Sequence, residues 1–169
     1  MYVKDAIRNS LLMTDRAVMG PLAAIEDAPL TFPTGNGGCH PLWVVGHLAF
    51  VEGFTHELLG AGSNPVAGWA AIFGQDTVPV ADAAVYPSLS EVRERYVELR
   101  KRTLQLLDGM SEADLDTRTA WQPAGLEEQF GTYGKALLSV ALHQMMHHAH
   151  VTDAIRAACR ATAPLATAA

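Results

Sequence analysis

The sequence contains few cysteines, and none of its apolar runs is long. Only two of the 169 residues are cysteine, Cys39 and Cys159, and they do not form a Cys-x-x-Cys pair. A small disulfide-stapled domain is therefore excluded, and a reducing, cytoplasmic setting is expected. No apolar run reaches the ~18 residues that a membrane-spanning helix needs, and the N-terminal segment lacks the uninterrupted apolar stretch of a signal peptide.

Charged residues are also sparse, and their balance is acidic. They make up 18% of the chain, below the ~25% usual in globular domains, and the formal net charge is −6. The densest basic stretch lies between Arg93 and Arg102 and includes Arg100. Acidic residues alternate with it, which is typical of a solvated helix face. Nucleic acid is not an expected partner, since its phosphates require a basic surface.

Apolar residues recur at steps of three or four in four long segments, and no alternating strand pattern is present. We expect helices over residues 3–19, 41–60, 88–109 and 132–161, with Gly20-Pro21 ending or bending the first. The connection 61–87 is too long for a tight turn and is typical of a crossover between parallel helices. The sequence predicts an all-α four-helix bundle, in one domain over residues 1–161 with a frayed C-terminal tail at 162–169.

Histidines gather near the C-terminus, where four of the seven lie between positions 143 and 150. His143 and His147 are four residues apart, so on a helix they share one face and could hold one metal ion. Such a pair also arises often by chance. His150 falls near the same face, whereas His148 points elsewhere. Gln144 stands where a zincin-type protease has glutamate, which argues against that class.

A third histidine lies on the apolar face of the second predicted helix. His47 is expected to point into the core, where a polar ring needs a partner. The His143 and His147 pair is the only obvious one, and three histidines with an open fourth position are typical of a catalytic metal site. His56, nine residues further on, is expected to be exposed on the opposite face of the helix.

Other polar and apolar residues are weaker candidates. Cys39 and His40, just before the second helix, could line the mouth of a pocket together with Trp43, although a structural role is the alternative. Glu52 lies off the helix face of His47, so the sequence offers no clear general acid or base. Outer apolar positions of the last helix, among which we place Leu137, Leu138 and Met145, favour pairing of two copies.

Two segments resemble motifs of the DinB-like superfamily. Residues 43–48, WVVGHL, resemble its W..GHL segment, and residues 143–150, HQMMHHAH, resemble its HxxxHRGQ segment. The resemblance spans nearly the whole chain in order. It implies an up-down-down-up four-helix bundle with a divalent metal on His47, His143 and His147. The chain departs from the motif at His148 and His150, and we expect His150 to be a partner of a ligand rather than an extra ligand.

The resemblance also implies a function. Related proteins include metal-dependent transferases and isomerases that use mycothiol, bacillithiol or glutathione. We therefore expect zinc or nickel, a low-molecular-weight thiol as a candidate cofactor, a small-molecule substrate and a homodimer, with thiol S-transfer or hydrolysis as the reaction. One alternative is a non-catalytic metal-binding or ligand-binding bundle in a stress response. Another is a structural bundle whose histidines are incidental.

Overall fold

The computed structural model describes residues 2–23, 31 and 39–162 of the chain, and they are helical or irregular. The long helices are α1 (Val3–Ala23), α2 (Pro41–Leu58), α4 (Leu89–Gly109) and α6 (Tyr133–Thr162). The short ones are η1 (Ala67–Trp69), α3 (Ala70–Phe73), η2 (Ala83–Val85), η3 (Ala113–Asp116) and α5 (Glu127–Phe130). Within these residues the only β pairing is one isolated bridge, so the predicted all-α class is confirmed. None of the helices described is long and apolar enough to cross a bilayer.

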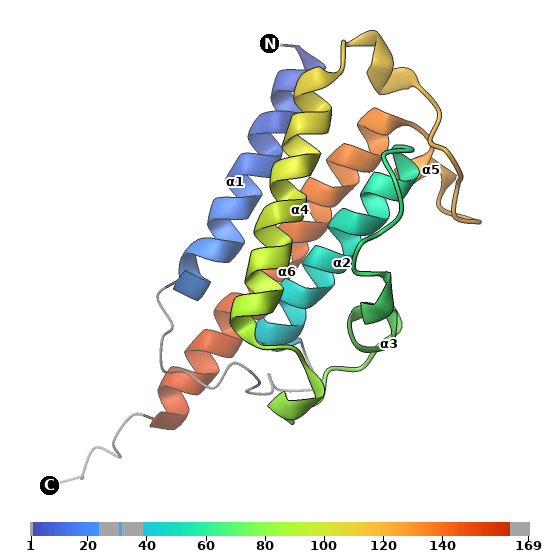
Figure 1. Cartoon of the computed structure of the whole chain (residues 1–169). Helices are drawn as coiled ribbons and strands as arrows, with labels where there is room; N and C mark the ends of the chain where they lie inside the picture. Colours follow the sequence, from blue (N-terminus) through green and yellow to red (C-terminus); the bar gives the residue numbers. More distant parts are fainter. Residues whose placement is uncertain (1, 24–30, 32–38, 163–169) are drawn as a thin grey trace, which may run out of the picture.

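The four long helices lie side by side along a common direction (Figure 1). In that view α2 and α4 run upward, whereas α1 and α6 run downward. Helix α1 packs against α6, and α2 packs against both α4 and α6. Because α2 and α4 run the same way, the chain must travel back along the bundle between them. Residues 59–88 make this return and carry η1, α3 and η2.

Local signals set the starts of two long helices, α2 and α4. Pro41 begins α2, where a missing N–H is not needed, and the His40 ring accepts a hydrogen bond from the backbone N–H of Trp43. Ser88 caps α4 in the same way. Helix α1, however, does not end at Gly20-Pro21 but continues to Ala23, because a proline in the last turn removes only one hydrogen bond. Of the tail predicted to fray, 163–169 lie outside the described residues.

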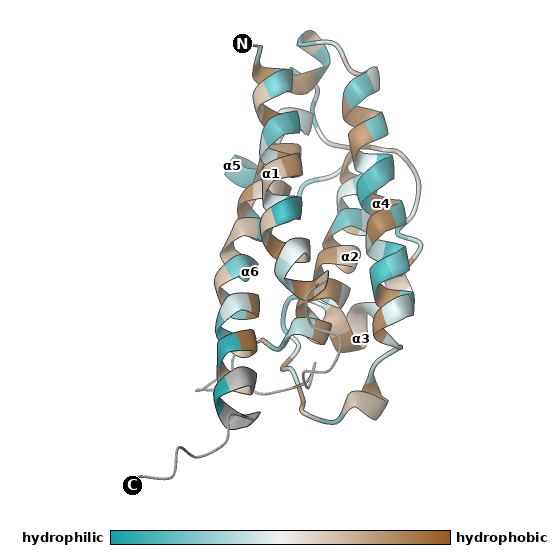
Figure 2. Ribbon diagram, turned by 90° about the vertical axis from the view of Figure 1, so that its left-hand side faces the viewer, coloured by the Kyte–Doolittle hydropathy of each residue, from teal (hydrophilic) through white to brown (hydrophobic). Residues whose placement is uncertain are grey.

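The core consists of two apolar clusters, one toward each end of the bundle. One gathers around residues such as Trp43 and Phe73, and the other around residues such as Leu11 and Leu137. Leu137 is fully buried, so its placement at an outer position was wrong: it faces α1 rather than solvent. Apolar and polar segments alternate along α1 and α4 in Figure 2, as expected for helices with one exposed face.

Helix α2 is buried on nearly all sides, whereas the sequence pattern predicted only one apolar face. His56 was expected to be exposed but is 2% exposed, and its Nε2 lies 2.9 Å from the hydroxyl oxygen of Thr103 on α4. Helix α4 covers the face of α2 that points away from α6. A helix with apolar residues on every face is buried on every face. A polar residue on either face of α2 therefore needs a partner.

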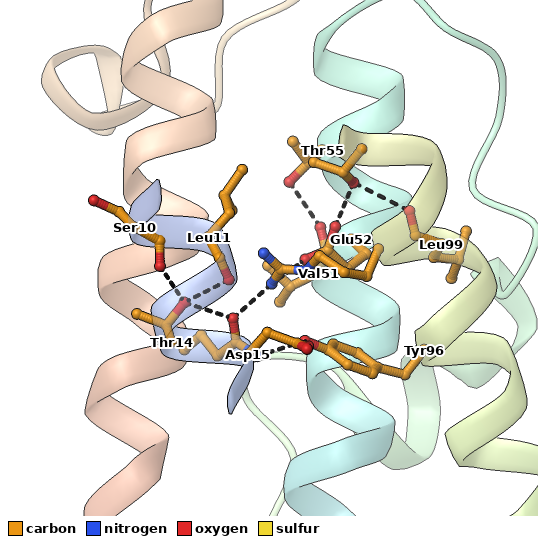
Figure 3. Close-up of polar contacts among 12 residues, drawn as sticks. Ser10, Leu11, Thr14, Asp15, Val51, Glu52, Thr55, Tyr96 and Leu99 are labelled. Atoms are coloured by element: carbon orange, nitrogen blue, oxygen red, sulfur yellow. Dashed lines mark hydrogen bonds and ion pairs between the residues drawn. The ribbon is translucent and has the colours of Figure 1, made fainter. Parts of the chain in front are cut away.

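A layer of polar side chains lies between the two apolar clusters. Figure 3 shows polar contacts in this layer, with Asp15, Glu52 and Tyr96 labelled. Arg100, expected on a solvated face, is 5% exposed and forms an ion pair with Glu52 at 2.6 Å. Arg100 also donates to Gln144, whose side-chain amide donates to Tyr96, and the Tyr96 hydroxyl donates to Asp15 at 2.6 Å. These contacts join α1, α2, α4 and α6 at one level. They also account for the burial of two opposite charges, each of which needs the other.

Candidate metal centre

The structure brings the three sequence-predicted ligands together. His47 comes from α2, and His143 and His147 come from successive turns of α6. The Nε2 atom of His143 lies 3.2 Å from Nε2 of His47 and 3.1 Å from Nε2 of His147. The ligand atoms of all three residues lie within 4.8 Å of one another. Three ring nitrogens from two helices therefore converge on one small volume.

These distances fit a bound cation. Zn–N bonds of ~2.05 Å at tetrahedral angles would place two ligand nitrogens about 3.3 Å apart, close to the two separations observed. Without a cation, only some of the three nitrogens could hydrogen-bond to one another, and the remaining lone pairs would face each other. The donor set is also suitable, since neutral imidazole binds zinc, nickel, copper and iron.

The ring of His47 is held in one orientation by its surroundings. Its Nδ1 lies 2.7 Å from the backbone carbonyl oxygen of Phe73, which can only accept, so Nδ1 carries the proton and Nε2 has the lone pair. The indole of Trp43, one turn earlier, stacks on the imidazole with ring centroids 4.5 Å apart. Trp43 therefore covers one face of the predicted ligand.

A glycine makes the contact between α2 and α3 possible. A Cβ atom on Gly46 would overlap the ring of Phe73, so only glycine lets that ring lie against α2. The same approach brings the Phe73 carbonyl to His47. Gly46 belongs to the segment that resembles the family motif, and the structure gives it a physical role in orienting the neighbouring histidine.

His147 is oriented from its other edge. Its Nδ1 lies 3.2 Å from Nδ1 of His150, which is exposed. A hydrogen bond there leaves Nε2 of His147 free to face His143. By contrast, Nδ1 of His143 is buried without a hydrogen-bond partner among the described residues.

All three rings are held in the neutral form that metal binding requires. Burial lowers the pKa of His47, and the hydrogen bond to Phe73 opposes this only in part. Burial, with a smaller effect of His47, lowers the pKa of His143 to about 4. Burial, followed by repulsion from the neighbouring histidines, lowers the pKa of His147 to about 3. At neutral pH the three Nε2 atoms can therefore act as ligands.

Cys39 and His40 lie at the start of α2 but differ in their surroundings. The ring of His40 caps α2 and its Nε2 lies 2.9 Å from the carbonyl oxygen of Val80, which holds the crossover against the helix. Cys39 is half-buried, and its Sγ lies within 4.8 Å of ring nitrogens of His147 and His150. Burial raises the pKa of the Cys39 thiol and a backbone hydrogen bond opposes the rise only in part, which disfavours the thiolate form of a free nucleophile.

Gln144 is a residue near the centre that sequence reasoning considered only as a missing glutamate. It lies between two histidines along α6, is fully buried, and accepts hydrogen bonds from Arg100 and Thr14 at 2.7 and 2.9 Å. The polar layer therefore fixes the turn of α6 that carries His143. The sequence does contain a signal for the burial of Gln144, because Gln144 shares one helix face with the apolar residue Ala141.

Comparison with known proteins identifies the family to which the chain belongs. A search of curated proteins gave no match to the chain. Among protein families, the DinB superfamily matches residues 13–151, a segment that includes His47, His143 and His147. The match covers most of the chain and confirms the resemblance carried by the two histidine motifs. The chain therefore belongs to the DinB superfamily.

Proposed function

We propose that this protein is a metal-dependent enzyme for small-molecule substrates, with zinc or nickel held by His47, His143 and His147. The convergence of three neutral Nε2 atoms on one point carries the proposal. Three protein ligands leave at least one coordination position open, as in catalytic rather than structural sites. The superfamily match and the possible three-histidine group both fit a metal-dependent protein.

The proposed reaction is thiol S-transfer, or hydrolysis where water takes the place of the thiol. When bound, a divalent ion supplies the positive charge that lowers the pKa of a coordinated thiol or water. The residues of the chain hold the ligands ready: the Phe73 carbonyl keeps the proton of His47 on Nδ1, and Trp43 shields one face of that ring from water. The thiol would be a low-molecular-weight cofactor.

A specific observation favours a non-catalytic alternative. Among the described residues, neither group of side chains that could hold a metal includes a carboxylate. Glu52 is engaged by Arg100 and Thr103 in the polar layer. A metal-binding or ligand-binding bundle of a stress response would need no general acid or base, whereas most enzymes of these reaction classes use one close to the ion.

Metal binding can be tested with the purified protein. We expect the metal-free protein to gain about 2.7 kcal/mol of stability at a free Zn²⁺ or Ni²⁺ concentration 100 times the dissociation constant, or about 5–11 °C in Tm. His47→Ala and His143→Ala should abolish this gain. His148→Ala is the control, since His148 contacts Thr152 instead of the other rings. Unchanged metal content in both test variants would refute the site.

Catalysis is tested separately. The metal-loaded protein is assayed with bacillithiol, mycothiol and glutathione against a panel of electrophiles, and with hydrolysable esters and amides. We expect turnover that His143→Ala abolishes and His148→Ala retains. Bound metal with no turnover across the panel would favour the non-catalytic alternative.

We further propose one domain over residues 1–161, an up-down-down-up bundle and a homodimer in the cytoplasm. The helix directions in Figure 1 support the bundle order. The outer face of α6 supports pairing, because Leu138, Leu142 and Met146 are 41%, 60% and 68% exposed. A dimer mass by light scattering is expected, and Leu142→Lys should shift it to monomer. A monomer mass for the unaltered chain would contradict the pairing.

A further inference from the structure

A second group of ligand atoms lies next to the three-histidine centre. It consists of Sγ of Cys39 and one ring nitrogen each of His147 and His150, all within 4.8 Å of one another. His150 is exposed and Cys39 is half-buried, so this group opens toward solvent, whereas the three-histidine group is largely enclosed. The second group joins Cys39 to His147, 108 positions later in the chain, and it shares His147 with the three-histidine group.

The shared residue uses a different edge of its ring in each group. Nε2 of His147 faces His143 at 3.1 Å, and Nδ1 faces His150 at 3.2 Å. The two ring nitrogens of an imidazole point in diverging directions, so the same ring can present one lone pair to each group once Nδ1 has lost its proton. The inner group takes Nε2, which leaves Nδ1 for the group with Cys39 and His150.

We propose that Cys39, His150 and Nδ1 of His147 form a second cation position, with His147 bridging the two ions. A thiolate with two imidazoles suits a divalent ion that accepts sulfur, such as Zn²⁺ or Co²⁺. When the second ion binds, the thiol proton of Cys39 and the Nδ1 proton of His147 pass to solvent. The inference rests on the proposed metal centre only through His147, which belongs to both groups.

The competing reading is a simple hydrogen bond. In it, Nδ1 of His147 donates to Nδ1 of His150, the Cys39 thiol packs nearby, and the chain holds one ion. The 3.2 Å separation fits this reading as well. The two readings differ in the number of ions per chain and in whether sulfur is a ligand, and both quantities can be measured.

The experiment titrates the reduced, metal-free full chain with Co²⁺ and records bound ions per chain together with the absorption spectrum. Thiolate ligation gives an intense sulfur-to-cobalt charge-transfer band that histidine ligation does not. We expect two ions and the band for the unaltered chain. Cys39→Ser and His150→Ala should bind one ion without the band, and His47→Ala should bind one ion with it.

Matched controls exist for both kinds of ligand. Cys159→Ser tests the other cysteine in the chain, and His148→Ala tests a neighbouring histidine outside both groups. Both variants should keep two ions and the band. Far-UV circular dichroism confirms that each variant is folded, so a lost ion reports a lost ligand.

The outcomes separate this inference from the proposed function. Saturation at one ion without the band, with that ion lost in His47→Ala and kept in Cys39→Ser, would overturn the second position and support the three-histidine centre. An ion that needs Cys39 but neither His47 nor His143 would support the second position and overturn the proposed function. A band that survives Cys39→Ser would overturn sulfur ligation by that residue.

Discussion

Replacing Arg100 by methionine should destabilise the metal-free protein by about 3–5 kcal/mol near neutral pH. Nη2 of Arg100 lies 2.6 Å from Oε1 of Glu52, and the two side chains are 6% and 1% exposed. Methionine is apolar and of roughly similar length, so the main change is the loss of a positive charge. Glu52 would then be a buried carboxylate that keeps only the hydrogen bond from Thr103.

The cost of this substitution should depend on pH. Burial raises the pKa of Glu52, and Arg100 opposes the rise. Without Arg100 the pKa rises further, so the folded variant holds a proton that the unfolded chain has released. Stability of the variant therefore increases as the pH falls through this raised pKa, by at most about 1.4 kcal/mol per pH unit. The penalty should be smaller at about pH 5.5 than at about pH 8.

Urea unfolding followed by circular dichroism measures the effect. With a slope of about 2 kcal/mol per molar urea, a loss of 3–5 kcal/mol lowers the midpoint by about 1.5–2.5 M. Arg95→Met is the matched control, because Arg95 pairs with Glu98 at 3.0 Å while both side chains are more than half exposed. That variant should lose less than about 1 kcal/mol.

A second substitution shows whether the buried charge is the cause. Adding Glu52→Gln to Arg100→Met removes the unpaired carboxylate and should recover part of the loss. The reasoning is refuted if Arg100→Met costs no more than Arg95→Met. It is also refuted if the cost is the same at both pH values, since Glu52 would then not be the group left unpaired.

Three further predictions concern packing and buried polar groups. Gly46→Ala should lower the stability by about 1–3 kcal/mol, because the added methyl group overlaps Phe73 of α3, and should weaken metal binding about 10–100-fold. The control is Gly20→Ala, where the added methyl group meets open space and neither loss is expected. Equal metal affinities of the two variants would contradict this prediction. Burial lowers the pKa of His56 to about 4, so acidification from about pH 6.5 toward 4 protonates the unfolded chain first and destabilises the fold. His56→Gln should lose less stability over that range by urea unfolding, and an identical pH profile would count against the shift. Tyr96→Phe should cost about 1–3 kcal/mol by thermal unfolding, because the amide of the buried Gln144 loses its acceptor, and an unchanged Tm would argue against that hydrogen bond.

The helices and the histidine pair were predictable because they depend on local spacing. Apolar periodicity, Pro41 and the Ser88 cap gave the long helices to within a few residues at most ends. A separation of four residues on one helix brings His143 and His147 together whatever else the fold does. The apolar face of the second predicted helix then supplied His47, which the family motif also contains and which the structure places beside that pair.

The surroundings of α2 were not predictable in the same way. A helix that packs on two sides has no outer face, and the sequence pattern showed only the face of His47. The sequence therefore predicted an exposed His56, a solvated Arg100 and a Glu52 that lies away from the site. In the structure each of these side chains is buried with a partner. Such burial depends on charges and hydrogen bonds supplied by another helix, which no local pattern reports.

The sequence by itself determined the all-α class, the family and the three histidines that we propose as ligands, because these follow from spacing and motif. Only the tertiary structure decided what surrounds them. It brought the Phe73 carbonyl to His47, the polar layer to Gln144, and the Cys39 thiol to His147 and His150. These contacts join residues far apart in the chain, so they exist only once the helices have packed and water has been excluded between them.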